Sequence, residues 1–110
     1  MSYPQPNVEV HWDRERPNPG ATLIRTTPYG ERLIRHVRPI GLVSQIEAGW
    51  IIGVSRMWIN TLVRAKVLRD VRQRAGVPGA GRDVSRIPLS EIKKYMRQQR
   101  IPLEDRRLFV

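Results

Sequence analysis

The segment SQIEAGWIIGVSR, residues 44–56, constrains the fold more than any other part of the chain, because it contains a helix start, a helix stop and a second helix start. Ser44 and Glu47 have the spacing of a capping box, in which a hydroxyl and a carboxylate satisfy backbone N–H groups at the beginning of a helix. Gly53 tolerates the left-handed backbone that ends many helices, and Ser55 is a second N-cap. The segment therefore predicts two helices joined by a short turn.

Apolar residues recur at helical intervals in both of these helices, which places them on one side of each. Val54 lies between the helices and is expected to fill the space where they meet. The inward-facing residues are predicted to be Ile46, Trp50 and Ile51 in the first helix and Ile59, Leu62 and Val63 in the second. With the second helix extending over residues 56–66, the segment predicts a helix-turn-helix.

Two short strand-like runs follow, RDVRQR at residues 69–74 and DVSRIP at 83–88. The stretch AGVPGAG between them contains three glycines and a proline, a composition typical of a long hairpin tip. We therefore expect a β-hairpin over residues 70–87, referred to as a wing. Ser90 has the position of another N-cap, and a third helix is expected to direct Ile92, Tyr95 and Met96 inward.

The first 40 residues are predicted to contain an arm and a second hairpin. Residues 1–20 include four prolines and little periodicity, so we expect a flexible arm without stable structure of its own, although it can order on a partner. The runs Thr22–Thr27 and Arg32–Val37 are separated by the turn-forming PYGE, which predicts a β-hairpin. Residues 101–110 receive no predicted element.

Together these elements predict an α+β fold. Its centre is a small winged helix-turn-helix domain over residues 41–100, with three short helices and a β-hairpin wing. A β-hairpin extension (21–40) and the flexible arm (1–20) precede it, and a C-terminal tail (101–110) follows. A chain of 110 residues is long enough for one modest core and too short for a cleft between two lobes.

Positive charge is concentrated in the same region as the helices. The chain carries 20 Lys and Arg against 10 Asp and Glu, a formal net charge of +10. Residues 54–100 contain twelve of these cations and three acids, for a net charge of +9, whereas residues 1–20 carry −1. A polyanion relieves such self-repulsion, and nucleic acid is the leading candidate.

Several classes of protein are disfavoured by what the sequence lacks. It has no cysteine for a disulfide or thiolate metal site, and His11 and His36 are too few and too far apart for a zinc cluster. No acid–base pair, Ser–His arrangement or phosphate-binding loop indicates an enzyme, so no catalytic residue, metal or cofactor is assigned. The longest apolar run, WIIGV, is too short for a membrane span, so we expect a soluble bacterial protein of the cytoplasm, associated with the nucleoid.

Three motifs in order, GVSR at residues 53–56, LVRAKVL at 62–68 and RIPLSEI at 86–92, resemble those of winged helix-turn-helix domains of the MerR superfamily. The likeness is greatest to the small excisionase-like members encoded by phages and integrative elements. The resemblance implies that the second helix enters the major groove and that the wing contacts the flanking backbone or minor groove. It also implies a sequence-specific double-stranded DNA-binding protein that acts in excisive recombination or as a small transcriptional regulator.

The outward face of the second helix presents the candidate base-reading residues. Arg56 suits the two acceptors of guanine and Asn60 the donor and acceptor of adenine, and each bidentate contact contributes about 1–3 kcal/mol of discrimination. Ser55 and the helix N-terminus suit a phosphate, and the wing arginines suit phosphates or the minor groove. The predicted DNA-binding residues are Ser55, Arg56, Met57, Asn60, Thr61, Arg64, Lys66, Arg72, Arg74, Arg82 and Arg86.

Each of these assignments has a purely structural alternative. Arg56 and Arg64 also fit an ordinary solvated helix face, and Asn60 also fits a residue that faces only water. Trp58 is expected to pack rather than to stack on a base, and His36 is expected on a strand surface.

The partners expected from the sequence are double-stranded DNA and further copies of the chain, because one module of this size buries little DNA surface. The hairpin at 22–37 and the terminal LFV are candidates for self-association, as a dimer or an array on DNA, or else pack on their own domain. The alternative function is a protein-interaction subunit, antitoxin-like or part of a phage DNA-packaging complex. Its N-terminal arm would bind a protein partner and its winged domain would serve only as a DNA anchor. No membrane partner is expected.

Overall fold

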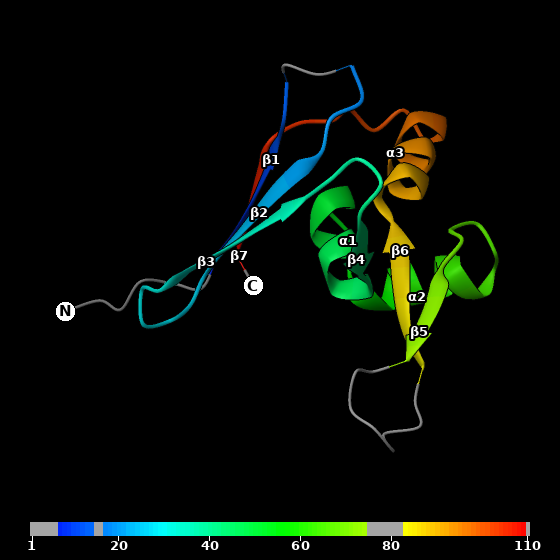
Figure 1. Cartoon of the computed structure of the whole chain (residues 1–110), viewed down its shortest axis with the longest axis horizontal. Coiled ribbons are helices and arrows are strands. Elements are labelled where there is room, and N and C mark those ends of the chain that lie inside the picture. Colours follow the sequence, from blue (N-terminus) through cyan, green and yellow to red (C-terminus); the bar gives the residue numbers. More distant parts are fainter. Residues whose placement is uncertain (1–6, 15–16, 75–82, 110) are drawn as a thin grey trace.

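A computed structural model describes residues 7–14, 17–74 and 83–109 of the chain, without the side chains of residues 73, 74 and 83. Three helices and two antiparallel sheets confirm the predicted α+β class (Figure 1). Sheet A has the strand order β3-β2-β1-β7 and sheet B the order β4-β6-β5. The elements are β1 (Asn7–Trp12), β2 (Ala21–Thr26), β3 (Arg32–Val37), β4 (Leu42–Ser44), α1 (Gln45–Ile52), α2 (Arg56–Arg64), β5 (Val71–Arg74), β6 (Asp83–Pro88), α3 (Leu89–Gln98) and β7 (Arg106–Phe109).

The prediction of a flexible arm is wrong for Asn7–Trp12, which form the inner strand β1 of sheet A. Val8, Val10 and Trp12 alternate with half-buried residues and are themselves buried, as expected of a strand with one face on a core. The prolines that suggested an arm flank this strand and do not interrupt it. Residues 1–6 and 15–16 of the predicted arm lie outside the described residues.

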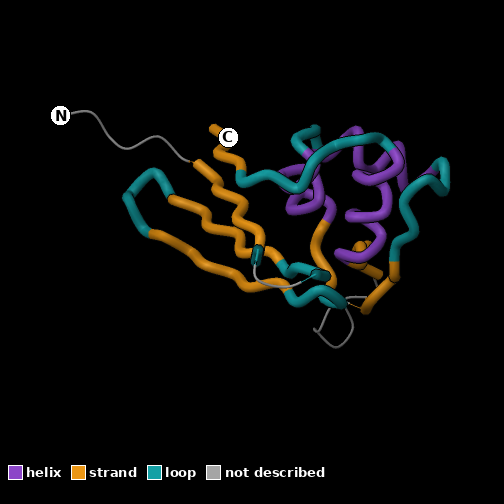
Figure 2. Tube along the Cα trace, turned by 90° about the horizontal axis from the view of Figure 1, so that it is seen from above, coloured by secondary structure: helices purple, strands orange, loops and turns teal. Residues whose placement is uncertain are grey.

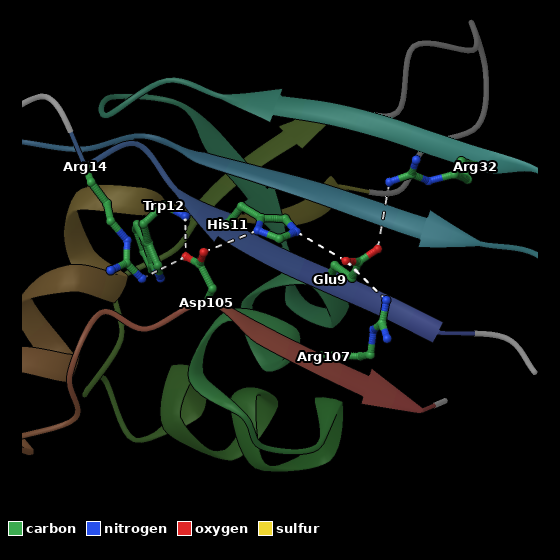
Figure 3. Close-up of polar contacts among 7 residues, drawn as sticks. All are labelled: Glu9, His11, Trp12, Arg14, Arg32, Asp105 and Arg107. Atoms are coloured by element: carbon green, nitrogen blue, oxygen red, sulfur yellow. Dashed lines mark hydrogen bonds and ion pairs between the residues drawn. The ribbon is translucent and has the colours of Figure 1, made fainter.

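The C-terminal tail, for which no element was predicted, supplies β7 at the other side of β1. Arg106 pairs with Val10 and Phe109 with Asn7, so two segments almost a chain length apart lie side by side. Asp105 secures the beginning of β7, because its Oδ1 accepts a hydrogen bond from the Trp12 backbone N–H at 3.1 Å (Figure 3).

The predicted hairpin within residues 21–40 is confirmed as β2 and β3, paired from Ala21 with Val37 to Thr26 with Arg32. Gly30 in the connecting turn has φ 86°, a left-handed conformation that favours glycine. This turn projects from sheet A away from the helices (Figure 1). His36 is exposed on β3, as expected, and lies 3.0 Å from the Thr22 hydroxyl.

The capping box that begins α1 is confirmed. Ser44 Oγ accepts from the Glu47 backbone N–H at 3.2 Å, and Glu47 Oε1 accepts from the Ser44 backbone N–H at 2.9 Å. The helix ends at Ile52, and Gly53 is its C-cap with a left-handed φ of 88°. These two signals therefore set both ends of α1, as the sequence predicted.

The predicted inward face of α1 is wrong in part. The buried residues are Ala48, Gly49, Ile51 and Ile52, whereas Ile46 is 47% exposed and Trp50 is half-buried. The reason is the tight approach of the following turn, since a Cβ added at Gly49 would lie 2.7 Å from the Val54 carbonyl oxygen. Packing of the turn on Gly49 rotates α1 so that Ile46 and Trp50 lie beside sheet A.

The second helix begins at the predicted cap, because Ser55 Oγ accepts from the Trp58 backbone N–H at 3.1 Å. Its predicted inward residues Ile59, Leu62 and Val63 are all buried. The helix ends at Arg64, two residues before the predicted end, and Lys66 follows with a left-handed φ of 59°.

The third helix begins at Leu89, with Pro88 rather than Ser90 as its N-cap, and no side-chain hydrogen bond caps it. The predicted cap is wrong because β6 runs directly into the helix and buries Leu89. The predicted inward residues of α3, Ile92, Tyr95 and Met96, are confirmed as buried. Lys93 is buried with them.

One hydrophobic core joins both sheets and all three helices. Its fully buried members include Val10 of β1, Val43 of β4, Ile51 of α1, Ile59 of α2 and Ile92 of α3. The β5–β6 hairpin, predicted over residues 70–87, is present up to Arg74 and from Asp83 onward. Among the described residues, no helix is long and apolar enough to cross a membrane.

Candidate nucleic-acid interface

A groove of about 480 Å³ lies between α2, the beginning of α1 and the β5–β6 hairpin. It brings four predicted DNA-binding residues together from two separate elements, although they span 31 positions of the sequence. Arg56 and Asn60 come from α2, and Arg72 and Arg86 come from the hairpin. We call this surface the basic groove; it is lined by Ser44, Gln45, Ile46, Arg56, Asn60, Arg72, Val84, Ser85 and Arg86.

The outward face of α2 is as the sequence predicted. Arg56, Asn60 and Arg64 are four residues apart and therefore share one side of the helix. The other predicted contacts on this helix are also exposed, with Met57 at 82%. Residues exposed on or next to α2 are Ser55, Arg56, Met57, Thr61 and Arg64, and Asn60 is half-buried.

Two polar groups on this face already have partners within α2. The Ser55 oxygen caps the helix, and Thr61 Oγ1 donates to the Met57 carbonyl oxygen at 3.0 Å. With its proton in that bond, the Thr61 hydroxyl retains only acceptor capacity for a ligand. Trp58, which was expected to pack, is 49% exposed, so its ring packs only in part.

A chain of hydrogen bonds joins the hairpin to α1 at the base of the basic groove. Gln45 Nε2 donates to Ser85 Oγ at 3.1 Å, and Ser85 Oγ donates to Asp70 Oδ2 at 2.7 Å. Arg72 Nε lies 3.3 Å from the same Asp70 oxygen. This network links Arg72 to α1 through Asp70, Ser85 and Gln45.

The sequence did not identify Gln45, Asp70 and Ser85 as site residues. One signal was available for Asp70, because it is one of only three acids among the residues from 54 to 100. An acid within a strongly basic segment can form an ion pair with one of the neighbouring cations. No local pattern marks Gln45 or Ser85, whose role depends on the contact between α1 and β6.

The basic groove carries uncompensated positive charge. Of its arginines, only Arg72 has an ion pair; Arg56 and Arg86 have no acidic partner among the described residues. The three arginines that line the groove therefore have one carboxylate partner among the described residues, Asp70. An anion with several negatively charged oxygens satisfies them best, because guanidinium groups bind phosphate with paired N–H donors.

Four further predicted contacts lie on or next to α2 but do not line the basic groove, namely Ser55, Met57, Thr61 and Arg64. The remaining three predicted contacts are not on this face of α2 or are not fully described. Lys66 lies beyond the end of α2, in a separate depression of about 170 Å³ that also includes Arg69 and Lys94. Arg82 lies outside the described residues. For Arg74 only the backbone is described, as the last residue of β5.

Comparison with known proteins assigns the chain to no family. The sequence matches no protein-family model, and no curated protein or solved structure is significantly similar to the chain. The function is therefore inferred from the basic groove and its residues.

Proposed function

We propose that this protein binds double-stranded DNA in a sequence-specific manner, through a winged helix-turn-helix formed by α1, α2, the β5–β6 hairpin and α3. The observation that carries the proposal is the basic groove, in which Arg56 and Asn60 of α2 lie beside Arg72 and Arg86 of the hairpin. A major groove about 12 Å wide admits one helix. The hairpin arginines then lie beside the same stretch of duplex.

The residues divide into two roles. Arg56 and Asn60 have the side chains that pair with guanine and adenine in the major groove, and each good pair contributes about 1–3 kcal/mol of discrimination. Arg72 and Arg86 bind backbone phosphates, which position the protein without reading sequence. Arg64, one turn after Asn60, extends the same face of α2 along the duplex.

The biological role suggested by the sequence resemblance is excisive recombination or small-scale transcriptional regulation in a bacterium or phage. Both roles use the same DNA contacts, and neither requires a catalytic residue or cofactor. A module with a single recognition helix buries little DNA surface, so binding as a dimer or an array is expected. The proposal places the protein at the nucleoid in the cytoplasm.

The competing proposal, in which the N-terminal arm binds a protein partner, is less well supported. The described part of that arm contains β1, and both edges of β1 are already paired, with β2 and with β7. A strand with both edges occupied has no backbone groups left for a partner. To bind a partner through its backbone, β1 would have to separate from β2 or β7. The DNA-binding proposal requires no such change.

Selection from a random DNA pool tests the proposal. The protein is titrated against the pool at near-physiological salt, and the bound DNA is sequenced. Enrichment of a compact motif is expected, and Arg56→Ala and Asn60→Ala each relax the preference at particular base pairs. Arg86→Ala weakens binding to all sequences. It also reduces the slope of the logarithm of the binding constant against the logarithm of the salt concentration by about one.

A matched control is Arg38→Ala, because Arg38 is exposed and lines no groove at α2. This variant is expected to bind DNA like the parent protein. If salt-sensitive binding occurs without enrichment, α2 is not a sequence reader and the groove is only a phosphate clamp. Binding that is equally reduced by Arg38→Ala and Arg86→Ala would contradict the role of the basic groove.

A further inference from the structure

A second groove lies between α1 and the inner face of sheet A, which is the face with the buried residues of β1 and β2. It consists of two depressions of about 570 and 280 Å³ that share Arg25, Ile46 and Trp50. We call it the apolar groove and define it by Arg25, Leu33, Ile46, Trp50, Val54 and Leu108. Rotation of α1 by the Gly49 contact leaves Ile46 and Trp50 facing this space.

The strand β3 forms one edge of sheet A (Figure 2). Its residues Leu33 and Ile34 line part of this groove. Arg32 to His36 are exposed, with Leu33 at 51% and Ile34 at 56%. No described element pairs with the free edge of β3. An edge strand of six residues presents unpaired backbone N–H and C=O groups, which can accept a further strand.

The charges around this edge favour an acidic occupant. Glu47 forms an ion pair with Arg35. The carboxylate of Glu9 lies 3.4 Å from His11, 3.9 Å from Arg32 and 3.5 Å from Arg107 (Figure 3). Arg25, in the groove itself, has no acidic partner among the described residues. On the outer face of sheet A, Arg32 and Arg107 share the one carboxylate of Glu9, so the described residues of this face keep an excess of positive charge.

A second copy of the chain is a poor occupant, because each copy carries a net charge of +10 and the edge of each is itself basic. Like charges on directly opposed strands are destabilising, whereas opposite charges stabilise the pair. A partner with a carboxylate opposite Arg32 gains this stabilisation.

We propose that β3 and the apolar groove bind an extended acidic segment of a partner protein. The segment pairs with β3 as a fifth strand of sheet A, and its alternate side chains point to opposite faces. Apolar side chains on one face enter the groove beside Leu33 and Ile46. Acidic side chains on the other face lie beside Arg32, on the outer face of β3.

This inference does not depend on the DNA-binding proposal. Three residues line both grooves, Ser44, Ile46 and Arg56. Leu33 lines only the apolar groove and Arg72 only the basic groove. A DNA-bound copy still presents the edge of β3, because the β2–β3 turn and the start of β3 project away from the helices (Figure 1). The two activities are separable by substitution.

The test uses a fluorescent peptide of about eight residues, the length of a typical strand, in which valine and glutamate alternate. A matched peptide has lysine in place of each glutamate. Two further peptides carry backbone N-methyl groups on one or the other alternate set of residues, which removes the hydrogen-bond donors from one edge at a time. Fluorescence anisotropy measures the binding of each to the full chain.

The expected result is saturable binding of the glutamate peptide and none of the lysine peptide. One N-methylated peptide binds and the other does not, because only one edge of the added strand faces β3. Leu33→Asp weakens binding by about tenfold or more, through charge repulsion in an apolar site. Arg72→Ala leaves peptide binding unchanged and Leu33→Asp leaves DNA binding unchanged, so failure of one proposal is distinguishable from failure of the other.

Three results would overturn the inference. These are no saturable binding of the glutamate peptide, equal binding of the lysine peptide, or equal binding of both N-methylated peptides. A dimer in sedimentation that Leu33→Asp dissociates would assign the edge to a second copy instead. Because Leu33 is half exposed, its substitution is expected to leave the fold intact, which circular dichroism checks.

Discussion

Glu47 forms an ion pair with Arg35, which joins the end of the β2–β3 hairpin to the beginning of α1. The same carboxylate caps α1 by accepting the Ser44 backbone N–H at 2.9 Å. Arg35 also donates to the Leu42 carbonyl oxygen at 2.6 Å, in the strand that leads into the helix. One acidic residue therefore fixes both the start of α1 and the position of sheet A relative to it.

Substitution of Glu47 is expected to cost more stability than substitution of Arg35. Glu47→Ala removes the cap and the ion pair together and lowers the free energy of unfolding by about 1–2 kcal/mol. Arg35→Ala keeps the cap and costs about 0.5 kcal/mol, as is usual for an exposed pair. Urea unfolding measures both, and equal losses would show that the capping bond contributes nothing.

Ser55→Ala and Ser90→Ala are expected to differ. Ser55 accepts the Trp58 backbone N–H, so its loss lowers the free energy of unfolding by about 1 kcal/mol. Ser90 is exposed and makes no capping bond, so Ser90→Ala changes stability by less than about 0.5 kcal/mol. Thermal unfolding of the two variants checks the contrast, and a loss at Ser90 equal to that at Ser55 would contradict it.

Gly49→Ala is expected to destabilise the protein, although alanine is normally the better helix residue. Its Cβ would lie 2.7 Å from the Val54 carbonyl oxygen, and a backbone atom cannot give way cheaply. The expected loss is about 1–3 kcal/mol, the usual cost of overpacking. Chemical unfolding measures it, and a variant as stable as the parent would show that the turn can move away from α1.

Asp70→Asn is expected to strengthen DNA binding to all sequences. The substitution removes the carboxylate paired with Arg72, while the amide oxygen can still accept from Ser85. Binding is expected to release about one more counterion, so the binding constant falls more steeply as the salt concentration rises. Glu104→Gln, with the same charge change at an exposed residue that lines neither groove, is the control. If both variants bind alike, the effect comes from net charge and not from the basic groove.

The stability of the protein is expected to fall in acid partly through Asp105. The backbone N–H of Trp12 holds the pKa of Asp105 below its ordinary value of 3.8, His11 and Arg14 lower it further, and desolvation opposes the shift. A carboxyl with a lowered pKa in the folded state stabilises the fold above its unfolded pKa and loses that contribution as the pH falls through its folded pKa. Unfolding midpoints from pH 7 into the acid range are expected to fall less steeply for Asp105→Asn, and the same slope as in the parent protein would refute this role.

Elements whose signals lie within a few residues were predicted well from the sequence. Ser44 and Glu47 set the start of α1, Gly53 its end and Ser55 the start of α2, because a cap bonds to backbone groups two or three residues away. The outward face of α2 also follows from helical spacing, so the predicted exposure of Arg56 and Arg64 is confirmed. The expected third cap at Ser90 is wrong, because the strand before it, rather than a local side chain, starts α3.

Tertiary structure alone decided how distant segments combine. The prolines on either side of β1 led to the prediction of an arm there, and no local pattern predicts β7. The two strands pair with each other across nearly the whole length of the chain, and a local pattern cannot show such a pairing. The approach of the turn to Gly49 exposes Ile46, and the contact between α1 and β6 brings Gln45 to Ser85. The sequence by itself determined the three helices, the caps of α1 and α2 and the basic face of α2, because those depend on short-range geometry. Only packing determined the sheet order and the two grooves, because these depend on contacts between residues far apart in the chain.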